Sequence, residues 1–201
     1  MRFAPTTFRP AFGRVLSIIV VAIAVAGLVG FVVSGDWGGL VRYGWGLALL
    51  AVLAVALFWL PSLAVAEHEI TVRNVFSTVH VPWPAIQRID TKYALTLYTQ
   101  RGKVTVWASP APNRYAGQVS ASRDASLPGA GQGGSIRPGD LLSTPSGAAA
   151  YVIRSHYDQL VEDGHLDNPV IEEGAYRTEP HWVTIIALGA LALATLLGYL
   201  L

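Results

Sequence analysis

Five histidines and thirteen acidic residues are the side chains of this 201-residue chain that suit metal binding or proton transfer. No H-x-x-x-H or H-E-x-x-H pair occurs among them; the histidines are His68, His80, His156, His165 and His181. Cysteine is absent, which excludes thiolate nucleophiles, disulfides and cysteine-bound metal centres. The G-x-S-x-G and P-loop motifs are absent as well. We therefore predict a protein that is not an enzyme and that holds no cofactor and no metal.

A glycine-rich segment, Gly129–Gly134, matches the dinucleotide pattern G-x-G-x-x-G letter for letter. In a dinucleotide-binding fold, this pattern follows a strand and opens a helix. Here the segment follows Pro128, and Pro138 soon after it disfavours a helix. We interpret the segment as a flexible loop.

Four basic residues and one tryptophan are the remaining candidates for contacts with a partner or with lipid: Arg88, Lys92, Arg101, Lys103 and Trp107. The net charge of +1 argues against nucleic-acid binding, because no overall field attracts phosphate. The four cations can meet anionic lipid headgroups, at about 1 kcal/mol each near a membrane surface. Trp107 lies on the strand face opposite Val104 and Val106, and such aromatics serve as partner contacts or as membrane-interface anchors.

The segment from Glu67 to Pro110 positions these candidates. Apolar and polar residues alternate in it with the period of half-buried strands, as in Ile70–Arg73 and Val104–Trp107. Gly102, between two such runs, can adopt the positive φ of a short hairpin loop. The pattern predicts a meander of four or five antiparallel strands.

Three apolar segments predict membrane-spanning helices, at residues 15–33, 45–66 and 182–201. The first is long enough to cross a hydrocarbon core of about 30 Å at about 1.5 Å per residue. A cleaved signal peptide would have a shorter apolar region that ends in a small-residue cleavage site. We therefore predict that the first segment is retained and forms a hairpin with the second, through a polar turn at residues 34–44.

The distribution of arginine predicts the orientation of the chain. Residues 1–14 form a basic tail with three arginines, whereas the turn at residues 34–44 contains only Arg42. We therefore expect a multi-pass protein of the cell (inner) membrane, with the N-terminus and residues 67–181 in the cytoplasm and the C-terminus outside.

Two spans carry small residues at every fourth position, namely Ala22, Ala26 and Gly30 in the first and Ala190, Ala194 and Gly198 in the third. Such ladders let helix backbones approach closely in lipid. They are candidates for contacts between the first and third spans or with a partner's helix. The high frequency of alanine and glycine in the chain is the alternative explanation.

Beyond the meander, residues 109–145 are rich in glycine and proline, which predicts a long loop. An amphipathic helix is expected at residues 146–163, with Thr144 or Ser146 as its cap. This helix would cover the open apolar side of the meander. Residues 165–181 then form a polar linker to the third span.

Five segments share their order and spacing with a known family: Val81–Asp90, Ala94–Tyr98, Gly102–Pro110, Gly134–Asp140 and Ser146–Ala150. Through these segments, the middle of the chain resembles the actinobacterial family of small membrane proteins with a bacterial pleckstrin-homology (PH) domain. The resemblance implies a PH-like β-sandwich or half-barrel with one capping helix over residues 67–164. A full PH fold has two further strands, which would lie within residues 109–145 or be missing.

The resemblance also guides the functional prediction. Eukaryotic phosphoinositide-binding PH domains need clustered basic residues in the first strand turn, whereas Arg73–Ser77 carries a single charge. We therefore predict a module for protein interaction, an adaptor or accessory subunit of a membrane complex. It would dock partners through an exposed sheet edge, Trp107 and residues 109–145. The alternative is a peripheral anionic-lipid-binding or lipid-sensing module that uses Arg88, Lys92, Arg101 and Lys103.

Overall fold

The structure, a computed structural model, describes residues 5–110, 140–166 and 174–200. The chain folds into two compact units. One contains three long helices, and the other contains two antiparallel sheets and one further helix. The predicted fold class, membrane-type helices together with an antiparallel meander and a capping helix, is confirmed.

The helical unit consists of α1 (Ala11–Ser34), α2 (Trp37–Ala54) and α5 (Trp182–Leu200), and a π-helical turn, η1 (Val55–Trp59), extends α2. With 24, 23 and 19 residues, the three helices are long and apolar enough to cross a membrane. Between 6% and 17% of each apolar window is buried inside the protein, so most of its side chains suit a lipid environment.

The connection between α1 and α2 is shorter than the predicted turn at residues 34–44. Gly35 ends α1 with a φ of 71°, and the Asp36 side chain accepts a hydrogen bond of 2.8 Å from the Gly39 N–H. This cap starts α2 at Trp37, so Gly38, Gly39 and Gly44 of the predicted turn lie inside a helix. Gly44 is buried there, in a position where a Cβ would lie 3.3 Å from Leu28.

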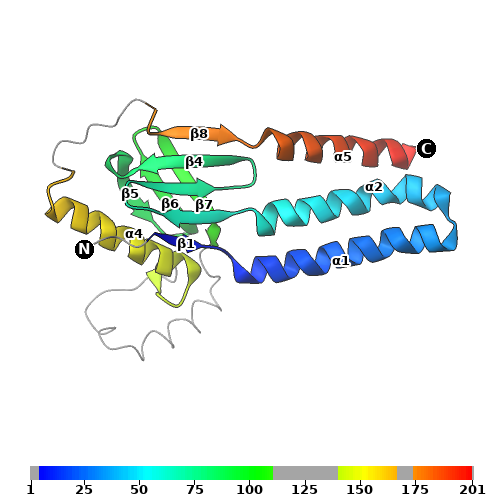
Figure 1. Cartoon of the computed structure of the whole chain (residues 1–201), viewed down its shortest axis with the longest axis horizontal. Helices are drawn as coiled ribbons and strands as arrows, with labels where there is room; N and C mark the ends of the chain where they lie inside the picture. Colours follow the sequence, from blue (N-terminus) through cyan, green and yellow to red (C-terminus); the bar gives the residue numbers. More distant parts are fainter. Residues whose placement is uncertain (1–4, 111–139, 167–173, 201) are drawn as a thin grey trace. The chain divides into compact units, whose positions relative to one another are not determined.

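Helix α2 lies between α1 and α5 (Figure 1) and packs on both. Gly198 of α5 is buried, and a Cβ at this position would lie 2.8 Å from the Val41 carbonyl oxygen. The third span therefore approaches the second span closely through one member of its small-residue ladder, instead of packing this residue on the first span. The ladder of the first span, Ala22, Ala26 and Gly30, is exposed.

The β-rich unit contains a five-stranded sheet of order β1-β2-β3-β4-β8 and a three-stranded sheet of order β5-β6-β7. The strands of the larger sheet are β1 (Thr6–Phe8), β2 (Ser62–Val65), β3 (Glu69–Arg73), β4 (Ser77–Pro82) and β8 (Arg177–Pro180). Those of the smaller sheet are β5 (Ile86–Asp90), β6 (Ala94–Thr99) and β7 (Gly102–Pro110). Strands β3 to β7 form the predicted meander, and Gly102 has a φ of 128° in the β6–β7 hairpin.

Three strands lie in segments for which the sequence predicted something else. Strand β1 lies in the predicted basic tail, β2 at the end of the predicted second span, and β8 in the predicted linker. Strand β2 pairs with both β1 and β3, through Leu63–Phe8 and Val65–Ile70. These strands supply members of the sandwich that the sequence left unassigned. The sequence analysis expected further strands within residues 109–145, and residues 111–139 of that range lie outside the described part of the chain.

The core of the β-rich unit lies between the two sheets and α4 (Pro145–Glu162). Aliphatic side chains from every layer are fully buried in it, including Leu63, Ile70, Leu97, Val106 and Ile153. Each such burial is worth about 1.5–3 kcal/mol. The Thr144 hydroxyl caps α4 by accepting a hydrogen bond of 3.1 Å from the Gly147 N–H. Helix α4 is therefore the predicted capping helix, and Thr144 is its cap.

A short 3₁₀ turn, η2 (Trp83–Ala85), carries the chain from the larger sheet to the smaller one. Pro82 is the last residue of β4, and neither Pro82 nor Pro84 has a backbone N–H that could extend the ladder. Trp83 is 2% exposed, and its indole N–H donates a hydrogen bond of 3.1 Å to the Ala66 carbonyl. Trp83 therefore anchors the corner between the two sheets.

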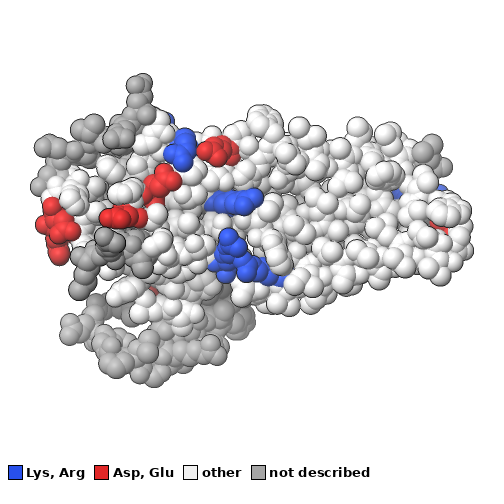
Figure 2. All heavy atoms as spheres, in the orientation of Figure 1, with Lys and Arg blue, Asp and Glu red and all other residues white. Residues whose placement is uncertain are grey.

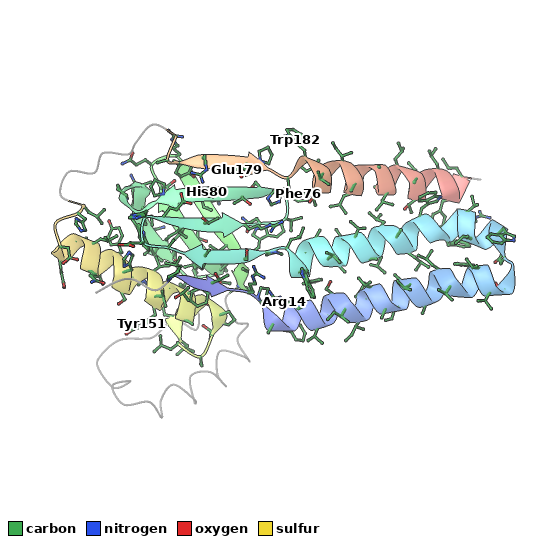
Figure 3. The ribbon with its side chains drawn as sticks, in the orientation of Figure 1. Arg14, Phe76, His80, Tyr151, Glu179 and Trp182 are labelled. Carbon is green, nitrogen blue, oxygen red and sulfur yellow. The ribbon has the colours of Figure 1, made fainter. Side chains whose placement is uncertain are left out.

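A charged cluster joins β8 to the larger sheet. The Nδ1 atom of His80 on β4 lies 2.7 Å from a Glu69 carboxylate oxygen, and its Nε2 atom lies 3.7 Å from Glu179 of β8 (Figure 3). Arg177 of β8 contacts both carboxylates, at 3.7 Å and 3.3 Å. The cluster fixes the strand that continues into α5.

Candidate functional site

The smaller sheet has one face in the core and one face outside it. Leu95, Leu97, Val104 and Val106 are buried, so the residues between them point outward, because side chains alternate along a strand. We call the outward set the β5–β7 face; it consists of Arg88, Asp90, Thr96, Tyr98, Lys103, Thr105 and Trp107.

A row of three side chains crosses this face. The strand register pairs Arg88 with Tyr98 and Tyr98 with Lys103. The Arg88 guanidinium lies 4.1 Å from the centroid of the Tyr98 ring, within the range of a cation–π contact. Arg88 also lies 3.9 Å from the Asp90 carboxylate. The row thus presents an aromatic ring between two cations.

Trp107 lies on the same face and is 45% exposed. Its backbone N–H donates a hydrogen bond of 3.1 Å to the side-chain oxygen of Asn74, which follows β3. The side-chain nitrogen of Asn74 donates in turn to the Thr105 carbonyl, at 2.8 Å. The Asn74 amide therefore acts like a strand partner for β7 and occupies two of the groups on its edge.

A hollow of about 280 Å³ adjoins the row at the β5–β6 turn, and it is lined by Asp90, Lys92, Tyr93, Ala94, Thr96 and Tyr98. The Lys92 ammonium lies 5.1 Å from the centroid of the Tyr93 ring, and Tyr93 is 80% exposed. The hollow is large enough to accept one side chain of a bound molecule.

Arg101 is engaged elsewhere. Its guanidinium donates a hydrogen bond of 3.1 Å to the Tyr176 carbonyl and lies 5.2 Å from the centroid of the Tyr176 ring. Arg101 thus holds the segment that leads into β8. The structure therefore brings Arg88, Lys103 and Trp107 together on one face, with Lys92 at the adjoining hollow.

Sequence reasoning missed Tyr98, Tyr93 and Asn74. The hairpin at Gly102 does predict that Tyr98 faces Lys103, because a short loop fixes the register of the two strands. The role of Asn74 has no local signal, because its partners lie 31 and 33 residues away.

No group of three or more His, Cys, Asp or Glu residues could hold a metal ion within residues 5–110, 140–166 and 174–200. The absence of enzymatic activity stays a prediction. The β5–β7 face offers aromatic rings, cations and one carboxylate, which are groups for non-covalent binding.

A comparison with protein families matches residues 60–150 to the family described as bacterial PH domain. Neither a curated protein nor a solved structure matches the chain. The match covers both sheets from β2 to β7 and the first turns of α4. It agrees with the order of strands and helix in the structure and with the predicted resemblance, although the actinobacterial part of that resemblance stays a prediction. Residues 60–150 of this chain are a bacterial PH domain.

Proposed function

We propose that the protein is a membrane-anchored adaptor whose PH domain docks a protein partner on the β5–β7 face. PH domains are commonly modules for protein or lipid interaction. The observation that carries the proposal is the row of Arg88, Tyr98 and Lys103 on the same sheet face as the exposed Trp107. Trp, Tyr and Arg are the residue types that contribute most often to the centres of protein interfaces.

Docking on this face differs from docking at a sheet edge. A partner strand that added to β7 would need the backbone groups of Thr105 and Trp107, and the Asn74 amide already binds both. The face of the smaller sheet therefore supports the proposal better than the edge of β7 does. The predicted contribution of residues 109–145 falls mainly on residues outside the described part of the chain.

Anionic lipid is a weaker candidate for the same face. Arg88, Lys92 and Lys103 would contribute about 1 kcal/mol each at a membrane surface. Arg88 already contacts Asp90, whose charge opposes anionic lipid. Three apolar helices are available to hold the chain in a membrane, so this small electrostatic gain would add little. A protein partner makes fuller use of the exposed rings.

The cytoplasmic location of the PH domain belongs to this proposal. The arginine count supports it, because Arg2, Arg9 and Arg14 precede or begin the first span and only Arg42 lies between the first two spans. Arg14 lies 5.5 Å from the Trp59 ring centroid, an interfacial pair at one end of the α1–α2 hairpin.

The test uses photo-crosslinking in native membranes. A photo-reactive phenylalanine analogue placed at Trp107 should crosslink the full-length protein to one partner protein. The same analogue at Tyr151, which is 60% exposed on α4 (Figure 3), is the matched control and should give no such product. Trp107→Ala should lower recovery of that partner by tenfold or more, since an interface tryptophan costs about 2 kcal/mol or more when truncated.

Two results would contradict the proposal. Equal crosslinking from Trp107 and Tyr151 would show that the face is not a specific surface. Recovery of phospholipid alone, with salt-sensitive binding of the full-length protein to anionic vesicles through Lys92 and Lys103, would assign the face to lipid instead.

A further inference from the structure

A cavity of about 420 Å³ lies in the β-rich unit, and none of its lining residues belongs to the β5–β7 face. Its wall comes from the β2–β3 turn, from η2 and from the C-terminal half of α4 with the residues that follow it; prominent members are Glu67, His68, Trp83, His156, Asp163 and His165. Cavities of this size hold small molecules. The proposed protein docking does not use it.

The floor of the cavity is fixed by hydrogen bonds and ring contacts. The Trp83 indole N–H donates to the Ala66 carbonyl at 3.1 Å, and the His156 ring meets the Trp83 ring edge-on, with centroids 4.7 Å apart. The Nε2 atom of His156 lies 3.4 Å from the Glu67 carbonyl oxygen. Both rings are nearly fully buried. These two rings therefore fix the base of the cavity, so a ligand would enter without an ordering cost for them, although they expose little surface to it.

The charges around the cavity favour a cation. The described residues that line it include two carboxylates, Glu67 and Asp163, and no lysine or arginine. Asp163 is also the C-cap of α4, so the negative end of the helix dipole lies at the cavity. Figure 2 shows acidic side-chain atoms at this end of α4. The exposed imidazoles of His68 and His165 add nitrogen atoms that can accept hydrogen bonds.

We propose that this cavity binds a small organic amine in its ammonium form. The carboxylates of Glu67 and Asp163 would neutralise the ammonium, and the apolar lining residues Pro84 and Leu160 would contact the carbon atoms of an organic amine. A bare metal ion fits less well, because no described group of His, Asp or Glu side chains has the placement to hold one. A free amine fits better than a phospholipid headgroup, since the described residues of the lining include no lysine or arginine for a phosphate.

The experiment is a ligand-observed saturation-transfer NMR titration of the full-length protein in detergent, with ethanolamine and putrescine as probes. Saturation transfer that reaches a plateau is expected for the wild-type protein. The double variant Glu67→Gln/Asp163→Asn should weaken binding at least tenfold. Both residues are exposed, so the variant should fold, and circular dichroism checks this. The control Asp158→Asn/Glu162→Gln removes the same charge outside the cavity wall and should change binding less than about twofold.

The probes also identify the source of the amine. If phosphorylethanolamine binds more weakly than ethanolamine, the ligand is a free amine. If phosphorylethanolamine binds more tightly, the ligand is an ethanolamine lipid headgroup. The proposal is overturned if neither amine gives saturation transfer, if both double variants weaken binding equally, or if inorganic phosphate competes with putrescine. None of these outcomes depends on a protein partner at the β5–β7 face.

Discussion

The side-chain amide of Asn74 protects the edge of β7, and its replacement by alanine tests how the PH domain keeps that edge closed. Two hydrogen bonds are lost at once, the one from the Asn74 side chain to the Thr105 carbonyl (2.8 Å) and the one from the Trp107 N–H to the Asn74 oxygen (3.1 Å). Each such bond contributes about 0.5–1.5 kcal/mol net. Because the site is only partly buried and water can replace Asn74 there, we expect a loss of about 1–2 kcal/mol.

The assay is hydrogen exchange of the full-length protein in detergent, followed at the Trp107 amide. A loss of 1.4 kcal/mol corresponds to about a tenfold increase in exchange, so Asn74→Ala should exchange about tenfold faster than the wild type. Asn74→Asp separates the two bonds, since a carboxylate still accepts from the Trp107 N–H but cannot donate to the Thr105 carbonyl. Its Trp107 amide should stay close to the wild-type rate, although the domain is less stable.

The control is Gln87→Ala, an exposed amide on β5, which should leave Trp107 unchanged. An unchanged Trp107 exchange rate in Asn74→Ala, or an equal acceleration in the alanine and aspartate variants, would show that Asn74 does not close the β7 edge. An open β7 edge would also expose a template for strand pairing between molecules. Asn74→Ala should therefore aggregate more readily than Asn74→Asp, which light scattering would detect.

Three further substitutions test the packing within each of the two units. Gly198→Leu should lower the unfolding temperature in mild detergent, because a Cβ at Gly198 would lie 2.8 Å from a carbonyl oxygen of α2. Gly189→Leu is the control and should not lower it, because no atom lies within 4 Å of a Cβ there. Equal effects of the two substitutions would disprove close α2–α5 packing. Gly147→Ala should destabilise the PH domain by about 3 kcal/mol in urea unfolding, since its Cβ would collide with the Leu141 carbonyl, and a neutral result would place α4 differently. Glu179→Gln should accelerate amide exchange in β8 by about twofold to threefold, as expected for the loss of an exposed ion pair worth about 0.5 kcal/mol. Unchanged exchange would mean that the ion pairs of Glu179 with His80 and Arg177 do not hold β8 in place.

The sequence predicts the elements whose pattern repeats over several residues. Strands β3 to β7 alternate apolar and polar residues, and α4 has an apolar stripe and the cap Thr144, so both were predictable. Strand β2 was not, because Ser62–Val65 contains a single polar residue and directly follows an apolar helix. Strand β1 has only three residues, too few to show a period.

The β5–β7 face was predictable only where a residue's position follows from a pattern within one strand. The outward position of Trp107 follows from alternation with Val104 and Val106 within one strand. The contact of Arg88 with Tyr98 depends on the β5–β6 register, which a bulge between Ile86 and Arg88 shifts. Arg101 differs from the other candidates because its partner, Tyr176, lies 75 residues away. Long-range partners of this kind leave no local pattern in the sequence.

The topology supports the proposal that the smaller sheet is the one that binds a partner. All three connections to the apolar helices leave from strands of the larger sheet, namely from β1 to α1, from η1 to β2 and from β8 to α5. Each connection contains only one or two residues between the printed element ends, so none can act as a long flexible linker. Strands β5, β6 and β7 follow one another in the chain, and none of them connects directly to an apolar helix. The candidate residues Arg88, Lys103 and Trp107 therefore occupy the sheet that has no direct connection to an apolar helix, as expected if the larger sheet serves attachment and the smaller sheet serves recognition.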